Sequence, residues 1–420
     1  MGNLTRHRRP SGSKAPPLAV LVLVTGVGPL ALDTYLPALP ALQHSLSTSA
    51  AVAQLTVTAY ISGLALGQLV IGAASDGTGR RTPLLCSTAA FMTTCVICAI
   101  APNAGLLIVV RLLGGLAAGA GVATGRAVVS DYYEGNAAAK KFGTLASINF
   151  LGPVVAPAIG GLILTVGTWR TIFWSLSGLG VVMFVAVAAR LPESLPPSER
   201  HRGGVTATWA RMVDLLGTRV YLRHVLVSCL ATAGFFTYIG GSSFVLQTVY
   251  GISQTEYAIV FSVNALAMVV AGALFRVLVG RAGAVRLRLA GLLLATIASV
   301  ALVGLAFIPR SDRPSVVAPW IILSCVVAGM GLVIPASVTL AQQAGERFRG
   351  TASALQGGLS FLSGALVTPL TGVLGDTSLT AMALLMAGFM LAAVAALAAT
   401  SSPGWTGVQH MESGLKPWRS

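Results

Sequence analysis

Twelve long apolar runs dominate this sequence and restrict what the chain can fold into. A helix needs about 20 apolar residues to cross the ~30 Å hydrocarbon layer of a bilayer, and each run approaches that length. A mean hydropathy of +0.82 with only 9% charged residues excludes an ordinary soluble domain. We therefore predict an all-α polytopic membrane protein with twelve transmembrane helices. The predicted spans are residues 17–37, 51–74, 83–101, 106–129, 143–166, 171–190, 225–247, 256–278, 288–308, 319–341, 351–374 and 379–400.

The net charge of +15 is explained by where the basic residues lie. If the N-terminus is cytoplasmic, 22 Lys and Arg fall on the cytoplasmic side of the spans, whereas the other side receives Arg170, Arg310 and Arg313. This asymmetry follows the positive-inside rule. We therefore expect both termini in the cytoplasm, a location in the inner (cytoplasmic) membrane, and no nucleic-acid partner.

The longest polar stretch divides the spans into two groups of six. It runs from Leu191 to Arg223. The first apolar run is too long for a signal peptide and is followed by eleven more, so we expect it to stay as the first helix. Two six-helix halves are the architecture of a large class of transporters. The predicted parts are a cytoplasmic tail (1–16), an N-terminal half (17–190), a cytoplasmic linker (191–223), a C-terminal half (224–400) and a second cytoplasmic tail (401–420).

The sequence carries no pattern typical of enzymatic chemistry. No Ser/His/Asp arrangement, phosphate-binding loop or metal site is visible, and the 12 acidic residues are dispersed. Cys95 and Cys98 lie in an apolar run without nearby His or carboxylate, which indicates buried thiols. A polytopic membrane enzyme would need clustered His, Asp or Glu at a membrane face. We therefore expect a transporter without cofactor or metal, driven by an ion gradient.

Two charged residues lie inside predicted spans, where an unpaired charge costs about 2.5–3.5 kcal/mol or more. Asp33 is about four residues from the outer end of the first span, and Arg111 is about five residues into the fourth. At ~1.5 Å per residue both lie ~6–8 Å below the outer boundary, so each could neutralise the other. Asp33 is the only carboxylate well inside a span. These two residues are the predicted proton-coupling pair.

Small residues and prolines form two stripes on the fifth span. Gly152, Ala156 and Gly160 recur every four residues, with Pro153 and Pro157 beside them and Gly161 following. This spacing places the small residues on one helix face, where a neighbouring helix can approach closely. We predict a kinked, tightly packed helix.

Several short motifs resemble those of one transporter family. "GAASDGTGRR" (72–81) resembles the loop motif between helices two and three of the major facilitator superfamily, although Gly77 replaces a usual basic residue. The resemblance implies the major facilitator fold, with twelve helices in two six-helix halves. The segments that resemble its Bcr/CflA subfamily of drug:proton antiporters are "LDTYLPALP" (32–40), "GQLVIGAASD" (67–76), "GRAVVSD" (125–131) and "GTASALQG" (350–357).

The loop motif implies a cytoplasmic gate. Asp76 is expected to latch onto the positive N-terminal end of the helix that starts near Gly350, and Arg80 or Arg81 to pair with Asp131. Gly72 and Gly79 would permit close packing and a tight turn.

The other motifs imply an exporter. Gly152, Pro153, Pro157, Gly160 and Gly161 resemble the superfamily's antiporter motif. Arg111 in "RLLGG" occupies a motif arginine position, with Gly114 in place of the usual Gln.

Side chains within the spans that line the family's cavity are candidates for binding substrate. They are Tyr35, Asn149, Phe236, Tyr238, Asn264 and Gln356. The sequence therefore predicts a monomeric proton-coupled exporter of small drugs or antibiotics, with protons and the lipid bilayer as its other partners. An exporter of a metabolite, such as an amino acid or a self-made antibiotic, is the alternative.

Overall fold

The computed structural model describes residues 17–71, 77–133, 135–196, 200, 204–308, 315–375 and 378–399. Within these ranges every regular element is a helix. Eleven segments of the described chain are long and apolar enough to cross a membrane. The remaining predicted span corresponds to α7 (Gly135–Val166), whose apolar described stretch is the shorter Leu151–Val166. The predicted all-α membrane fold is confirmed.

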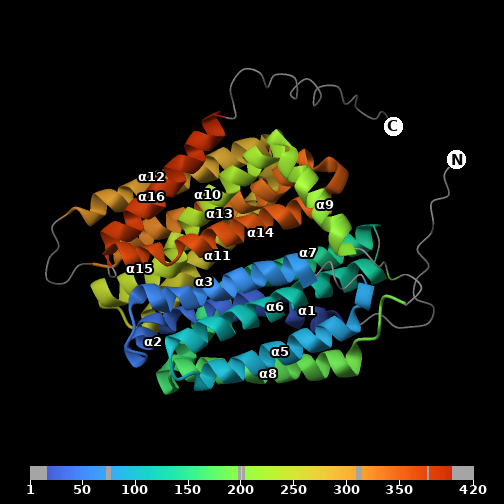
Figure 1. Ribbon diagram of the computed structural model, residues 1–420. Helices are drawn as coiled ribbons and strands as arrows, with labels where there is room; N and C mark the ends of the chain where they lie inside the picture. Colours follow the sequence, from blue (N-terminus) through green and yellow to red (C-terminus); the bar gives the residue numbers. More distant parts are fainter. Residues whose placement is uncertain are drawn as a thin grey trace.

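The N-terminal half comprises the helices up to residue 190, drawn in blue to green at the bottom of Figure 1. Its elements besides α7 are α1 (Leu18–Asp33), η1 (Leu36–Ala38), α2 (Leu39–Ser45), α3 (Ala50–Leu66), η2 (Gly67–Ile71), α5 (Arg81–Ile100), α6 (Ala104–Tyr132) and α8 (Trp169–Arg190).

The C-terminal half lies above it in the same view. Its elements are α10 (Arg219–Phe244), η4 (Val245–Val249), α11 (Gln254–Ala282), α12 (Ala284–Ala306), α13 (Val317–Ala344), η5 (Glu346–Phe348), α14 (Arg349–Val367), α15 (Leu370–Gly375) and α16 (Leu379–Ala399). The predicted linker is not simply a loop, because it contains a further helix, α9 (Gly204–Gly217), and the start of α10.

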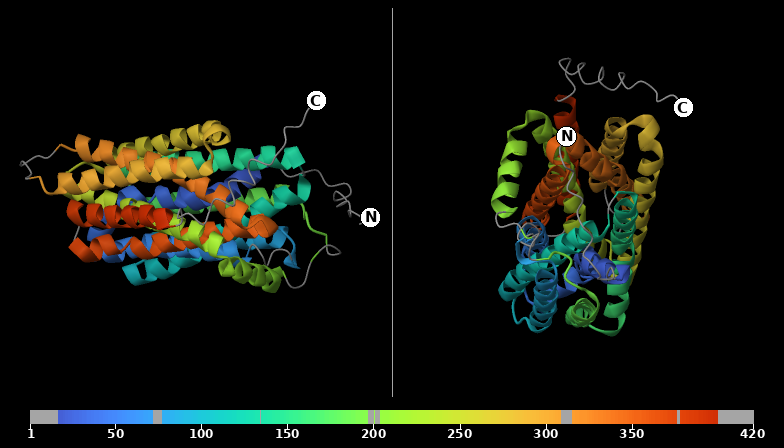
Figure 2. Two further views of the ribbon diagram at one scale, coloured as in Figure 1. Left: turned by 90° about the horizontal axis from the view of Figure 1, so that it is seen from above. Right: turned by 90° about the vertical axis from the view of Figure 1, so that its right-hand side faces the viewer.

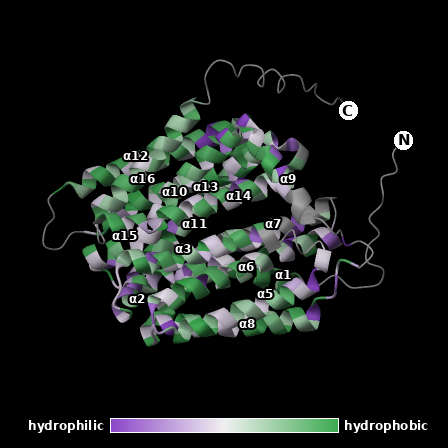
Figure 3. Cartoon of the chain, viewed as in Figure 1, coloured by the Kyte–Doolittle hydropathy of each residue, from purple (hydrophilic) through white to green (hydrophobic). Residues whose placement is uncertain are grey.

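The helices of both halves run roughly parallel to one axis (Figures 1 and 2). The halves meet where α3 packs against α14 and α7 packs against α11. Hydrophobic residues cover the length of the helices, and much of the hydrophilic surface lies near their two ends (Figure 3). Side chains such as Leu162 and Val277 are 69% and 71% exposed, as expected for residues that face lipid acyl chains.

Several spans are interrupted near the end of the bundle where α1 finishes. Helix α1 stops at Asp33, and the chain continues through η1 and α2, which begin beside Pro37 and Pro40. Proline cannot donate the backbone hydrogen bond of a helix, so it favours such breaks. Helix α10 changes to the π-helical turn η4, and α14 ends just before Pro369. We call this end the distal end, and the opposite end, which carries α9, the linker end.

Candidate functional site

Asp33 occupies the break at the distal end of α1. Its side chain is 5% exposed and forms no hydrogen bond or ion pair with another described residue. It lies within electrostatic range of the hydroxyls of Tyr60, Tyr238 and Tyr257. Tyr60 is on α3, whereas Tyr238 and Tyr257 are on α10 and α11. The carboxyl group therefore lies at the junction between the two halves.

Arg111 lies in an aromatic cage inside the N-terminal half. The guanidinium carbon is 4.1 Å from the ring centre of Tyr60, 4.8 Å from that of Tyr35 and 5.6 Å from that of Phe173. Its Nε donates to the backbone oxygen of Thr56 over 3.4 Å. The Nη2 atom is buried and has no hydrogen-bond partner within the described ranges. The cage thus holds a buried cation mainly through ring quadrupoles.

The cage is itself fixed by hydrogen bonds between helices. The Thr56 hydroxyl donates to the backbone of Ala53 over 2.6 Å, so the Tyr35 hydroxyl, 2.9 Å away, donates to Thr56. The hydroxyl of Tyr60 donates to the backbone oxygen of Gly28 on α1 over 3.1 Å. These bonds orient two of the three rings that surround the guanidinium.

Asp33 and Arg111 make no ion pair, although both lie in the described part of the chain. The sequence places them at similar depth but does not determine which way each helix face turns. In the structure Arg111 points into the cage, whereas Asp33 lies within electrostatic range of Tyr238 and Tyr257 in the other half. Tyr60 lies near both charges.

Two glycines of the predicted antiporter motif bring α7 against its neighbours at the distal end. A Cβ at position 160 would lie 2.0 Å from the backbone oxygen of Thr34, directly after Asp33. A Cβ at position 161 would lie 2.7 Å from the Cβ of Ala258 on α11. Gly152 is less constrained, because a Cβ at position 152 would lie 3.6 Å from its nearest neighbour, a side-chain carbon of Pro29. The Gly-Gly pair therefore packs α7 against both halves beside Asp33.

Hydrogen bonds join the two halves at the distal end. The Gln54 amide donates to Gly240 over 3.0 Å and accepts from the backbone N–H of Gly372 over 3.1 Å. Ser243 donates to the backbone oxygen of Leu36 over 2.8 Å. Each donor and acceptor is at least part-buried, so the bonds are protected from competing water. The distal end is closed in this structure.

The linker end contains the ion pair expected for the loop motif. Arg80 Nε lies 3.1 Å from Asp131 Oδ2, and Ser194 donates to the same oxygen over 2.6 Å. Arg81 turns away, and its guanidinium donates to the backbone of Ala188 over 2.9 Å. Gly72 and Asp76 lie outside the described residues, so the expected latch of Asp76 stays a prediction.

Glu193 is a member of this cluster that the sequence did not single out. Its carboxylate accepts the backbone N–H groups of Arg80 and Arg81 over 2.8 and 3.3 Å, and it thereby caps the start of α5. Gly79 has a φ of +94°, and a Cβ there would lie 2.6 Å from this carboxylate. The "GRR" turn needs glycine for both reasons. An acid soon after a span, in a loop of otherwise basic character, was the signal that could have identified Glu193.

Two of the predicted substrate-binding residues belong to one buried network in the C-terminal half. Asn264 donates to the Tyr238 hydroxyl over 3.1 Å. Its side-chain oxygen accepts from Trp320 and Ser324 over 3.1 and 2.6 Å. Tyr238 also stacks on Phe261, with ring centres 5.5 Å apart. Both candidates are 1% exposed, so this arrangement uses their polar groups for packing.

A second polar cluster surrounds Gln356. The amide donates to Ser228 and Ser360 over 2.5 and 3.1 Å, and these hydroxyls lie 2.9 Å apart. Its oxygen Oε1 is buried without a hydrogen-bond partner in the described part of the chain. Phe236, another candidate, packs edge-on against Phe361 on α14.

The remaining substrate candidates do not join these clusters. Tyr35 belongs to the cage in the N-terminal half. Asn149 lies on α7, but its side chain is outside the described part of the structure.

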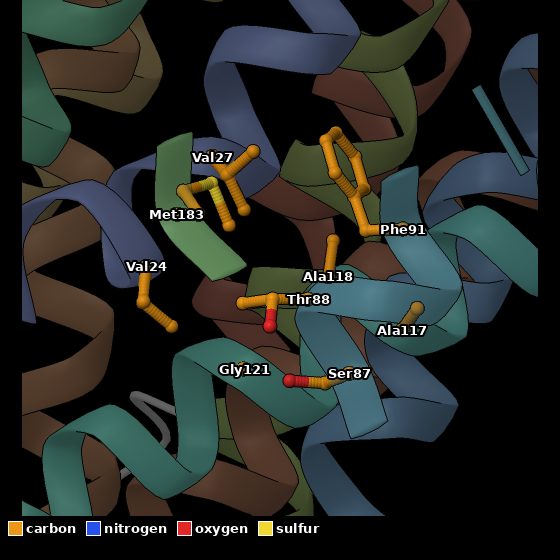
Figure 4. Close-up of a pocket in the computed structure, with 9 residues that line it drawn as sticks. All are labelled: Val24, Val27, Ser87, Thr88, Phe91, Ala117, Ala118, Gly121 and Met183. Atoms are coloured by element: carbon orange, nitrogen blue, oxygen red, sulfur yellow. The ribbon is translucent and has the colours of Figure 1, made fainter. Parts of the chain in front are cut away.

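A small gap inside the N-terminal half does not form a substrate site. It lies among α1, α5, α6 and α8 rather than between the halves (Figure 4), and it has no room for a water molecule. Its lining is Val24, Val27, Ser87, Thr88, Phe91, Ala117, Ala118, Gly121 and Met183.

One cation counted as cytoplasmic in the sequence is buried. Arg288, near the start of α12, is 1% exposed, and its Nη1 lies 3.1 Å from His224 Nδ1 on α10. Charge counting could not distinguish this packed arginine from an exposed one.

Comparisons with known proteins agree with this architecture. The family model of the Major Facilitator Superfamily matches residues 21–368. The uncharacterized MFS-type transporter YdgK of Bacillus subtilis (strain 168) is 34% identical over 397 residues, which cover 93% of this chain and 96% of that protein. Multidrug resistance protein MdtL of Escherichia coli O157:H7 is 27% identical over 239 residues. That alignment covers 56% of this chain and only 60% of MdtL.

Solved transporters share the fold at low sequence identity. The nucleoside transporter NupG superposes with a TM-score of 0.73 and 13% identity, covering 92% of this chain and 99% of that one. The D-xylose-proton symporter superposes with a TM-score of 0.69 and 15% identity, covering 90% of this chain and 96% of the symporter chain. These similarities concern the fold alone.

Proposed function

Because this chain belongs to the major facilitator superfamily of membrane transporters, we propose that it is a proton-coupled exporter of antibiotics or similar small drugs, of the Bcr/CflA type. The motif resemblances in both halves and the partial similarity to a multidrug resistance protein support this proposal. The positive-inside asymmetry supports placing the linker end in the cytoplasm. The distal end then faces outward.

The observation that carries the proposal is Asp33, a buried carboxyl group that pairs with no other described residue and lies between two halves that must move relative to each other. A coupling group has to exchange its proton with each side of the membrane in turn and respond to substrate. In this proposal Asp33 takes up a proton from the outside and releases it to the cytoplasm as the halves alternate. Arg111 favours the ionised carboxyl in the arrangement in which the two side chains approach.

The drug site is proposed between the halves. Phe236, Tyr238, Asn264 and Gln356 would contribute from the C-terminal half, and Tyr35 and Asn149 from the N-terminal half. The described members are closely packed here, so they would contact drug in an arrangement that separates the packed helices. Aromatic walls with a few amide and hydroxyl groups suit lipophilic drugs that carry polar substituents.

Everted membrane vesicles with an imposed pH gradient test substrate, direction and coupling together. We expect uptake of a chloramphenicol- or bicyclomycin-like drug that collapses when the gradient is dissipated. Asp33→Asn should abolish this uptake, because an amide cannot carry the proton, and Asp33→Glu should retain part of it. An exporter of an amino acid or of a self-made antibiotic would instead show no uptake of these drugs.

Drug-induced proton release from purified protein isolates the role of Asp33. The parent should release protons on binding drug, and Asp33→Asn should not. If the Asn variant releases protons as the parent does, another group couples transport to the proton gradient.

A further inference from the structure

Helix α9 presents three chemically different faces. At ~100° per residue, Met212 and Leu215 share the face that packs, buried, against the linker ends of α13 and α14. Trp209 and Val213 lie on the adjoining face and are 68% and 55% exposed. The third face carries polar and small residues, including the exposed Asp214. An amphipathic helix in water would need only two faces, so the exposed apolar one requires a separate explanation.

The position of α9 supplies that explanation. The helix lies at the edge of the linker end of the bundle and runs obliquely to the spans, as Figure 1 and the right panel of Figure 2 show. A helix placed there has the bundle on one side, the bilayer surface on another and water on the third. The three faces match these three surroundings.

Basic residues next to α9 suit an anionic surface. Arg219 and Arg223 are exposed one turn apart at the start of α10, on the same side as the exposed Leu222 and Leu226. Leu226, 52% exposed, lies on the outer surface of a helix long and apolar enough to cross a membrane. Met212 and Leu215 of α9 pack in one cluster with Tyr221 and Val225 of α10, so the exposed apolar face of α9 lies near this exposed stretch of α10 and its two cations.

We propose that α9 lies in the headgroup layer of the bilayer, with Trp209 and Val213 inserted at the acyl boundary and Arg219 and Arg223 bound to anionic phospholipid headgroups. Tryptophan favours this layer, and juxtamembrane arginines attract anionic lipid. Each cation near the surface favours binding by a factor of about five. This inference does not depend on the transported substrate.

Site-specific photo-crosslinking in proteoliposomes tests the proposal on the full chain. The photoreactive residue p-benzoylphenylalanine replaces Trp209 in one variant and Asp214, on the polar face, in a matched control. The vesicles contain phosphatidylcholine with or without phosphatidylglycerol, and mass spectrometry identifies the adducts. We expect lipid adducts at position 209, several-fold fewer at 214, and enrichment of phosphatidylglycerol at 209. That enrichment should disappear when Arg219→Gln and Arg223→Gln are combined.

Several results would overturn the proposal. Equal lipid labelling at 209 and 214 would mean that α9 is not oriented on the membrane. Adducts at 209 with another part of this chain, a second copy or another protein would identify a protein occupant instead. Unchanged phosphatidylglycerol enrichment in the double arginine variant would refute the assigned headgroup contacts. If replacement of Trp209 unfolds the helix, p-benzoylphenylalanine at Val213, on the same face, repeats the test.

Discussion

Arg111 shows how a single buried cation is accommodated without a carboxylate. Three aromatic rings face its guanidinium, and one backbone oxygen accepts from Nε. A desolvated cation–π contact contributes about 2 kcal/mol, so the cage offsets part of the cost of burying the charge. The free Nη2 is available to an anionic partner when the halves rearrange.

The contribution of the cage can be measured at Tyr60. Tyr60→Phe keeps the ring and loses the hydrogen bond to Gly28, which should lower the free energy of unfolding by about 0.5–1 kcal/mol. Tyr60→Leu also removes the aromatic face next to Arg111 and should cost about 1–2 kcal/mol more. Denaturant titration of the purified protein in detergent measures both changes in the free energy of unfolding.

An Arg111→Leu background provides the control for this pair. Without the cation, Tyr60→Leu should lower the free energy of unfolding more than Tyr60→Phe only by the amount that reflects the different packing of the two side chains. If the difference persists in full, the ring stabilises the protein by packing alone, and the cage is not a cation site.

The two buried charges are recognisable in the sequence, but the side chains around them are not. Asp33 and Arg111 stand out because charges are rare in apolar runs, and their depth follows from helix rise. The side chains around them come from α3, α8, α10 and α11 and from Tyr35 before η1, and no short-range pattern records how those helices are rotated. Trp320 and Ser324 were missed for the same reason, because polar residues scattered along a span indicate a network only once the span's neighbours are known.

At the scale of whole helices, the glycine pair of α7 determines how closely this helix approaches the end of α1, at Gly160, and α11 of the other half, at Gly161. Gly160→Ala should impair folding and transport, because its Cβ would lie 2.0 Å from a backbone oxygen that cannot rotate away. Overpacking of this kind costs about 1–3 kcal/mol. Thermal unfolding and vesicle uptake of the variant check this expectation.

Gly152→Ala is the matched control on the same helix. Its new methyl group would lie 3.6 Å from Pro29, an ordinary contact, so stability should change little. Equal effects of the two substitutions would show that loss of glycine flexibility, and not the contact with Thr34, is responsible.

Hydropathy located the helices but not their interruptions or the amphipathic helix. The twelve runs are visible because lipid demands a continuous apolar surface. The break after Asp33 was readable in principle from Pro37 and Pro40, yet proline is tolerated inside membrane helices, as Pro153 and Pro157 in α7 illustrate. Helix α9 is short and lies within a polar linker, so the helical spacing of Trp209, Met212, Val213, Leu215 and Leu216 was its only signal.

At the scale of the molecule, two packed halves are joined, among the described residues, by a few polar contacts at the distal end. The sequence predicted the halves from the position of the linker. It did not predict which end is closed, because the residues that close it are separated by up to 318 positions in the chain. Gln54 is the clearest case, since one amide bridges α3 to both α10 and α15.

Alternating access requires the closure at the distal end to break, so its hydrogen bonds should set the balance between states. Gln54→Leu removes both bonds of this amide and leaves a buried backbone acceptor on Gly240 and a buried donor on Gly372. With about 0.5–1.5 kcal/mol per bond, the population should shift several-fold toward the arrangement open at the distal end. Spin labels at His44 and Val373, exposed on opposite halves, report this opening as a longer distance, with the exposed Cys86 replaced by Ser.

Gln43→Leu is the matched control. It removes an amide on α2 at the same end, which takes no part in the bonds between the halves described above, and should leave the distance distribution unchanged. The same distribution in Gln54→Leu as in the parent would mean that apolar packing, rather than this amide, holds the distal end closed.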